Sequence, residues 1–304
     1  MKVLLKKTFI KSFHPIMLVC VSLISLLSGF LLSKEYHNLI SNKPTYDYLS
    51  NRLGAVIAII YFIMIIGFVF WIIISQISTG LFASEIHEGT MRLLLSKAIS
   101  RKELVFGKVG GMLLAGLVYL LIAMLLFMTS FSLFTSIDQD LLIYFYKITF
   151  ASYLYGVFVL FIVGGIGSLL STCFKKKVPA LLVILLIAMV CYAVFPILRN
   201  ILSANYYYRY HIYLIDINYH FGLIYQCFLD FFTQFDLSSG QKMMYAFFTN
   251  VYKVTALDID INTAGASFYS LNTTLSSLGV FITYLIIALA SYILSLKRMC
   301  KMDV

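Results

Sequence analysis

The chain has 304 residues, of which 61% are hydrophobic and only 12% are charged. This composition excludes an ordinary soluble globular protein, in which about a quarter of the residues are charged. The formal net charge of +10 is compatible with a nucleic-acid ligand, but the charges are placed as in a membrane protein that follows the positive-inside rule. We therefore expect a membrane protein and no nucleic-acid partner.

Residues 1–14 alternate lysines with large apolar residues, a pattern that predicts an amphipathic helix lying along the inner headgroups. The next run, Ile16–Leu32, is long and apolar enough to form the first span. A cleaved signal peptide is the alternative. No small-residue cleavage site follows the run, so we interpret it as an uncleaved anchor.

Five more apolar runs predict a total of six spans. The first of them, Leu53–Ala83, is longer than the bilayer requires, so its inner end is expected to extend beyond the membrane on the cytoplasmic side. The others are Leu104–Phe134, Leu141–Phe174, Val178–Leu198 and Thr273–Leu296. The segments that then lie inside hold 15 of the 23 Lys and Arg residues but only 4 of the 13 acidic residues. Both termini are accordingly placed in the cytoplasm.

Residues 84–103 form a charged interruption between the second and third spans, and part of it is amphipathic. Glu88 and Arg92 lie one helical turn apart, acid before base, which suits a helix. An apolar stripe recurs at i, i+3, i+4 and i+7 on the other side, at Met91, Leu94, Leu95 and Ala98. We predict a short helix over Ser84–Ala98 whose apolar face meets a protein. Packing of this face against the chain's own spans is the alternative.

The end of this interruption carries a helix-start signal. Ser100 is followed three residues later by Glu103, a capping-box pattern in which each side chain accepts a hydrogen bond from the backbone amide of the other residue. The pattern predicts that a new helix starts at Ser100 and continues into the third span.

The same segment resembles the ABC-2 type permease family, the membrane subunits of ATP-driven exporters that include bacitracin-resistance-like and sodium-efflux-like groups. The residues that carry the resemblance are Glu85, Glu88-Gly89-Thr90, Leu93-Leu94-Leu95-Ser96, Ser100-Arg101 and Gly107-Lys108. Ala98 stands where the family pattern usually has a proline, so the helix before it is expected to end less sharply. The six-span layout extends the resemblance over the whole chain.

The resemblance implies a single all-α permease domain over residues 1–304, with a cytoplasmic coupling helix between spans two and three. Two such subunits, identical or paired with a sibling, would assemble with two ATPase chains. ATP and Mg²⁺ would bind the ATPase, because this chain has no phosphate-binding loop of the form G-x-x-x-x-G-K-[ST]. The residues expected to couple to that partner are Glu85, Glu88, Gly89, Thr90, Met91, Arg92, Leu94, Leu95 and Arg101.

Residues 199–270 form the least regular part of the chain and hold 18 of its 48 Phe and Tyr residues. The run Ile212–Phe235 is nearly apolar enough for a span, but Asp216, His220 and Asp230 argue against a lipid-embedded helix. We predict an extracellular, aromatic-rich subdomain of interfacial or re-entrant helices between spans five and six. An aromatic cage for a ligand is the alternative for this region.

Two clusters of small residues suit close contacts between helices. They are Gly107 and Gly111 at the start of the third span, and Gly164, Gly165 and Gly167 in the fourth. The pattern leaves open whether either cluster packs spans within one subunit or across a dimer seam.

No catalytic or metal-binding pattern is complete in this sequence. His87 and Glu88 begin a zinc-protease motif, but Met91 stands where the second histidine is needed. The five cysteines form no C-x-x-C pair, so we interpret them as packing residues. We therefore expect neither an enzyme nor a bound cofactor or metal in this chain.

The favoured function is that of a permease subunit in a bacterial cytoplasmic membrane, exporting a hydrophobic or amphipathic molecule such as a peptide antibiotic or a lipid-like compound. Membrane lipid is an expected partner. A non-transporting sensor that detects a ligand through its aromatic outer region is the main alternative. An ion-driven carrier is disfavoured, because the predicted spans carry no ionisable residue in their cores.

Overall fold

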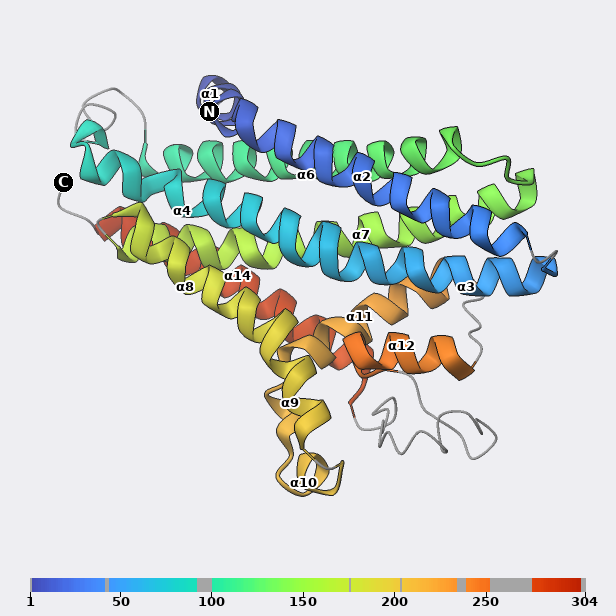
Figure 1. Ribbon diagram of the computed structural model, residues 1–304. Coiled ribbons are helices and arrows are strands. Elements are labelled where there is room, and N and C mark those ends of the chain that lie inside the picture. The colour runs from blue at the N-terminus through green and yellow to red at the C-terminus, as the bar shows by residue number, and fades with distance from the viewer. Residues whose placement is uncertain are drawn as a thin grey trace.

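The computed structural model describes residues 2–41, 44–91, 100–174, 176–202, 204–233, 239–251 and 275–301. Every regular element in these residues is helical, and none is a strand (Figure 1). Six helical segments are long and apolar enough to cross a membrane. The chain is therefore a multi-pass helical membrane protein, and the predicted number of spans is confirmed.

The six candidate spans differ in how regular they are. Four are single α-helices: α2 (Pro15–Ile40), α6 (Arg101–Leu133), α7 (Gln139–Cys173) and α14 (Ser277–Lys301). The second and fifth spans each contain a π-helical segment. The second joins α3 (Tyr46–Ile59), η1 (Ile60–Phe70) and α4 (Trp71–His87), and the fifth joins α8 (Lys177–Met189), η2 (Val190–Val194) and α9 (Phe195–Ile201).

The two π-helical segments lie against each other at Gly67. A Cβ at this position would lie 2.7 Å from the carbonyl oxygen of Phe62 and 2.8 Å from the ring of Tyr192 in η2. The rings of Phe62 and Trp71 also meet the ring of Tyr192 edge-on. Because Gly67 has no side chain, the second and fifth spans can approach closely in this aromatic part of the core.

The core is centred on α7, which contacts α4, α6, α8, α11 and α14. The peripheral helices α2, α8 and α14 instead expose apolar side chains, for example Leu23, Leu182 and Ile286. Exposed apolar side chains along the outer faces of long helices are expected where the surrounding solvent is lipid.

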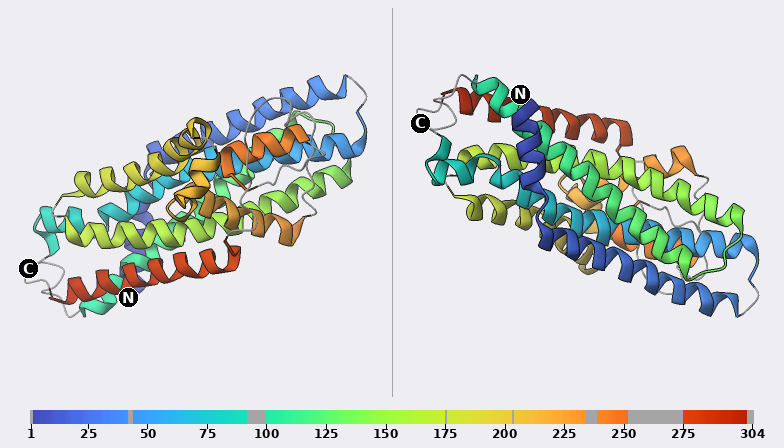
Figure 2. Two further views of the ribbon diagram at one scale, coloured as in Figure 1. Left: turned by 90° about the horizontal axis from the view of Figure 1, so that it is seen from below. Right: turned by 90° about the horizontal axis from the view of Figure 1, so that it is seen from above.

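The two ends of the bundle differ in charge. One end, which we call the basic end, holds the last turn of α14, the end of α4, the start of α6 and the first turn of α8 (Figure 1). Near this end α1 (Lys2–Ser12) crosses α6 (Figure 2). A Cβ at Gly111 would lie 2.7 Å from the carbonyl oxygen of Leu5, so α1 rests directly on the backbone of α6. Gly107, one turn earlier, is buried in α6.

The second glycine cluster also makes contacts within this chain. A Cβ at Gly164 would lie 2.9 Å from the hydroxyl of Tyr292, and one at Gly165 would lie 3.0 Å from the carbonyl oxygen of Ala288, both on α14. Gly167 faces α4 in the same way. The cluster therefore lets α7 pack closely against α14 on one side and α4 on the other.

The aromatic-rich region contributes α10 (Ala204–Arg209), η3 (Ile212–Leu214), α11 (Ile217–Phe232) and α12 (Ser239–Thr249). Of these, α11 enters the bundle and packs against α7 and α14. The hydroxyl of Tyr225 on α11 donates to the carbonyl oxygen of Ala58 at 3.0 Å. With 16 residues, α11 is about 24 Å long, which is short of the roughly 30 Å hydrocarbon core. It is a buried helix that does not add a seventh span.

Candidate functional site

The second span ends at the Glu-Gly-Thr motif. α4 continues to His87, and the amide of Glu88 still donates to the carbonyl of Ser84 at 2.9 Å. Gly89 then adopts a left-handed conformation, with φ of +70°. A left-handed glycine just past the last turn stops a helix, because other residues are strained there. The predicted start of a separate helix at Ser84 is corrected accordingly, since Ser84 lies in the last turn of α4.

Beyond this stop, the structure describes only the first residues of the predicted apolar stripe. Thr90 and Met91 are helical, and the next described residue is Ser100. The rest of the predicted helix, residues 92–98, lies outside the described residues and includes Arg92, Leu94, Leu95 and Ala98. Met91 is fully buried and belongs to the hydrophobic core of the bundle. The expectation of an exposed anchor is thus wrong for Met91, whose side chain is already packed within the chain.

The predicted capping box at the start of α6 is confirmed. The amide of Glu103 donates to the Ser100 hydroxyl at 3.2 Å, and the amide of Ser100 donates to the Glu103 carboxylate at 3.2 Å. Two amides that have no partner within the helix are satisfied in this way. The hydrogen bonds also place the negative charge of Glu103 at the positive end of the helix dipole.

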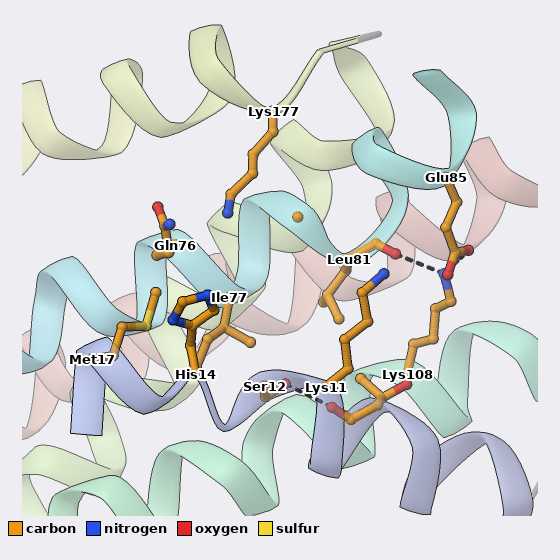
Figure 3. Close-up of a pocket in the computed structure, with 12 residues that line it drawn as sticks. Lys11, Ser12, His14, Met17, Gln76, Ile77, Leu81, Glu85, Lys108 and Lys177 are labelled. Carbon is orange, nitrogen blue, oxygen red and sulfur yellow. Dashed lines mark hydrogen bonds and ion pairs between the residues drawn. The ribbon is translucent and has the colours of Figure 1, made fainter. Parts of the chain in front are cut away.

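A buried ion pair joins the last turn of α4 to the second turn of α6. The Lys108 ammonium donates to the Glu85 carboxylate and, at 2.7 Å, to the carbonyl oxygen of Leu81 (Figure 3). The Lys108 side chain is 4% exposed and that of Glu85 is 15% exposed. A buried lysine requires such partners, because an unpaired ammonium in a low-dielectric interior is costly. Glu85 was predicted as a coupling residue, whereas the role of Lys108 as its partner was missed.

Arg101 ties the start of α6 to the end of α14. Its guanidinium donates to the carbonyl oxygens of Met299 at 3.2 Å and Cys300 at 3.0 Å. These carbonyls lie in the last turn of α14, where they have no partner within the helix and where a positive charge suits the helix dipole. In the same turn, Arg298 donates to the carbonyl oxygen of Thr172 at 3.1 Å and so reaches the end of α7.

These hydrogen bonds therefore join four spans, α4, α6, α7 and α14, close to where α4 ends and α6 begins. Of the predicted coupling residues, Glu85 and Arg101 take part in these bonds, whereas Glu88 and Gly89 are exposed. We name Glu85, Arg101 and Lys108 the loop base. Within the described residues, no group of three His, Cys, Asp or Glu side chains is placed to hold a metal ion.

A second buried ion pair lies at the aromatic-rich region. The Arg199 guanidinium donates to the Asp216 carboxylate at 2.8 Å and to the side-chain oxygen of Asn218 at 2.8 Å. Asp216 also caps α11 by accepting from the amide of Tyr219, and it accepts from the Tyr207 hydroxyl at 2.6 Å. Burial, together with the adjacent carboxylate of Asp216, raises the pKa of the Tyr207 phenol. Tyr207, one of the aromatic residues of this region, therefore belongs to a hydrogen-bonded network within the chain.

The complete sequence was compared with known proteins and protein families. A family model described as "ABC-2 family transporter protein" matches residues 4–304. The search of curated proteins gave no match. The family match covers all six candidate spans and includes the whole loop base.

Proposed function

Because the chain belongs to the ABC-2 transporter family, we propose that it is the membrane permease of an ATP-binding cassette exporter driven by a separate ATPase. Members of this family are membrane components of transport and are not themselves catalytic. The six candidate spans agree with that role. The finer assignment, to a bacitracin-resistance-like or sodium-efflux-like exporter, rests on the motif between Glu85 and Lys108.

The observation that carries the proposal is the loop base. In our proposal the ATPase docks on the connection between α4 and α6 and moves it when nucleotide is bound. Glu85 and Lys108 pass that movement to α4 and α6, and Arg101 passes it to α14. The ion pair suits this task, because it links the last turn of α4 directly to α6 and because Glu85 also faces a cavity, where its surroundings can change.

The proposed orientation places the basic end and both termini in the cytoplasm and the aromatic-rich region outside. The charge distribution supports this orientation through the positive-inside rule. The amphipathic α1, which exposes Val3 and Ile10, would then lie along the inner headgroups. The proposed location is a bacterial cytoplasmic membrane.

The proposed assembly contains two permease subunits and two ATPase chains. ATP and Mg²⁺ would bind the ATPase, and we propose no cofactor for the permease. The cargo class that fits is a hydrophobic or amphipathic molecule, because the exposed and buried faces of the spans are both predominantly apolar. Contacts of the glycine clusters within the chain leave the outer faces of α2, α8 and α14 for lipid or for the second permease subunit.

The test is a pull-down of the partner ATPase, combined with a measurement of its stimulation by the permease. Leu94→Asp, which places a charge on the predicted apolar stripe, should abolish recruitment without lowering the yield of folded permease. Arg101→Gln should preserve recruitment but reduce stimulation, because it detaches the connection from α14. Lys102→Gln is the matched control, since Lys102 is the exposed neighbour and the charge change is the same.

Normal recruitment and stimulation by Leu94→Asp at normal yield would contradict the proposed docking segment. A permease that associates with no ATPase at all would instead favour a sensor that acts through the aromatic-rich region. The structure offers that alternative less support, because Tyr207, Asp216 and Arg199 of this region are engaged with one another.

A further inference from the structure

A cavity of about 220 Å³ lies beside the loop base, between α1, α4, α6 and the first turn of α8 (Figure 3). Its lining combines apolar residues with polar and basic ones. The charged or titratable residues of its lining are Lys11, His14, Glu85, Lys108 and Lys177. Lysines thus outnumber the single carboxylate by three to one.

Two of these lysines have no carboxylate partner in the part of the chain that the structure describes. Lys108 is paired with Glu85, which leaves Lys11 and Lys177 to face the cavity from opposite sides (Figure 3). Within the described residues, neither of the two lies within ion-pair distance of an acidic side chain. Lys177 is partly buried, and its side chain runs 3.5 Å from the point where a Cβ of Gly80 would lie. Lys11 is exposed and Lys177 is partly buried, and two ammonium groups that face one cavity without an anion form a site for one.

The size of the cavity restricts what that anion is. A volume of 220 Å³ is roughly that of seven water molecules in the liquid, and it lies below the range of about 300–1,000 Å³ typical of pockets for drug-sized ligands. It therefore suits one small anionic group, such as a phosphate, and not a whole cargo molecule. The polar side chains of His14 and Gln76 offer further hydrogen bonds to phosphate oxygens.

The surroundings of the cavity point to the membrane as the source of that group. His14 stands between α1 and α2, and both helices expose apolar side chains next to it, including Ile10 and Ile16. Met17 supplies an apolar wall where an acyl chain would leave the cavity. Basic pockets between spans on the cytoplasmic side are a recurrent form of site for anionic lipid headgroups.

We propose that this cavity binds the phosphate of an anionic phospholipid from the inner leaflet, held between Lys11 and Lys177. The proposal goes beyond export and rests on the proposed function only for the cytoplasmic placement of the basic end. Because Glu85 and Lys108 form one wall, the bound headgroup would join α1 and α8 to the loop base. Lipid composition would then influence how firmly the connection is held.

The experiment is a lipid titration of the purified chain in detergent, followed by native mass spectrometry. The probes are dioleoyl-phosphatidylglycerol and dioleoyl-phosphatidylcholine, which share acyl chains but differ in net charge. One tightly bound phosphatidylglycerol is expected, with at least tenfold weaker binding of phosphatidylcholine. Lys11→Gln and Lys177→Gln should each weaken phosphatidylglycerol binding about tenfold, which corresponds to about 1.4 kcal/mol.

A charge-matched control separates a defined site from general attraction to a basic surface. Lys7 and Lys176 are exposed neighbours of the two proposed ligands and do not line the cavity. The double variant Lys7→Gln/Lys176→Gln should retain near-normal binding, whereas Lys11→Gln/Lys177→Gln should lose it. Equal losses in the two double variants would overturn the proposal.

A second variant fills the cavity without changing any charge. A leucine at Gly80 would project beside the Lys177 side chain into the space that the headgroup needs. Gly80→Leu should therefore weaken phosphatidylglycerol binding while the thermal unfolding curve stays close to that of the parent. Normal lipid binding by a folded Gly80→Leu protein would overturn the proposal.

Two further outcomes would assign the cavity to another ligand. Displacement of bound phosphatidylglycerol by excess inorganic phosphate would indicate a site for a soluble phosphate and overturn the lipid assignment. Unchanged lipid binding by Lys11→Gln/Lys177→Gln, together with lost ATPase pull-down, would assign the lysines to an acidic surface of the partner. The lipid titration itself needs no ATPase, so its result stands whether or not the proposed transport function holds.

Discussion

The two buried ion pairs of this protein are built differently. In the pair at the aromatic-rich region, the Asp216 side chain is fully buried and that of Arg199 is 8% exposed. Both carboxylate oxygens and both terminal nitrogens of the guanidinium have hydrogen-bond partners. At the loop base, Glu85 is 15% exposed and faces a cavity, and among the described residues Lys108 is its single ion-pair partner.

This difference suggests two roles: the Arg199–Asp216 pair is suited to holding the fold in place, and the Glu85–Lys108 pair is suited to transmitting movement. Asp216 caps α11 and joins it to α9 and α10, so the network fixes how the aromatic-rich region enters the bundle. Glu85 and Lys108 join only α4 to α6, and the open side of the carboxylate leaves room for water or a ligand. Separating a fully enclosed ion pair costs much free energy, so such a pair fixes one arrangement of its helices. A pair beside a cavity can move at a lower cost in free energy, because water or a ligand can solvate the carboxylate.

The largest effect is expected from Arg199→Met. This change leaves the carboxylate of Asp216 buried without its ion-pair partner, and we expect a loss of about 3–5 kcal/mol in the free energy of unfolding. The yield of folded protein and the thermal unfolding temperature in detergent measure it. Arg209→Met is the control, because Arg209 is exposed in the same region. A normal unfolding temperature for Arg199→Met would show that the network is not a structural pair.

A smaller effect is expected from Lys108→Met. Glu85 can be hydrated from the cavity, so we expect a loss of about 2 kcal/mol, below that for removing a fully enclosed partner. The additional change Glu85→Gln should restore part of this loss, because it removes the uncompensated charge. The double-mutant cycle, measured by thermal unfolding, gives the coupling between the two side chains.

The same Lys108→Met variant also tests the proposed role of this pair. Its stimulation of the ATPase should fall by more than its stability loss explains, since the pair connects the docking segment to α6. A loss of stability larger than that of Arg199→Met, with normal stimulation, would reverse the contrast between the two pairs.

The smallest effect is expected from lowering the pH, which should reduce the free energy of unfolding through His220 in the aromatic-rich region. His220 on α11 is partly buried; its Nε2 donates to the carbonyl of Tyr213 at 2.9 Å, and its Nδ1 accepts from the Tyr284 hydroxyl at 3.1 Å. Burial lowers the pKa of this imidazole, although the Tyr213 carbonyl and Asp216 oppose the shift. The unfolded chain therefore binds a proton more readily, so stability is complete above about pH 6.5 and declines as the pH falls below it.

His220→Gln should flatten this decline. Trp71, the one tryptophan of the chain, packs edge-on against Phe221 of α11, with ring centroids 5.7 Å apart, so its fluorescence reports on this region during unfolding. An unchanged pH profile in His220→Gln would show that another group controls the response to acid. The pH dependence of unfolding is also measured for Lys108→Met. An unchanged dependence in this variant would show that the decline at acidic pH does not involve the loop base.

Local sequence patterns determined the spans and the start of α6. Each span is a continuous apolar run, and an apolar run of that length has few alternatives to a membrane helix, since its backbone must satisfy its own hydrogen bonds. The capping box was equally predictable, because Ser100 and Glu103 are three residues apart and interact within a single turn. The interpretation of Ser84–Ala98 as a separate helix was less accurate, because Ser84 lies in the last turn of α4.

Only the tertiary structure decided which charges meet. Glu85 and Lys108 are 23 positions apart, and Arg101 reaches carbonyls nearly 200 positions away, so no local pattern pairs them. The burial of Met91 depends in the same way on the arrangement of the whole bundle, because a helical stripe looks identical whether it faces a partner or its own core. The position of α11 likewise depends on long-range contacts, such as the hydrogen bond from Tyr225 to Ala58 of α3 and the packing of α11 against α7 and α14.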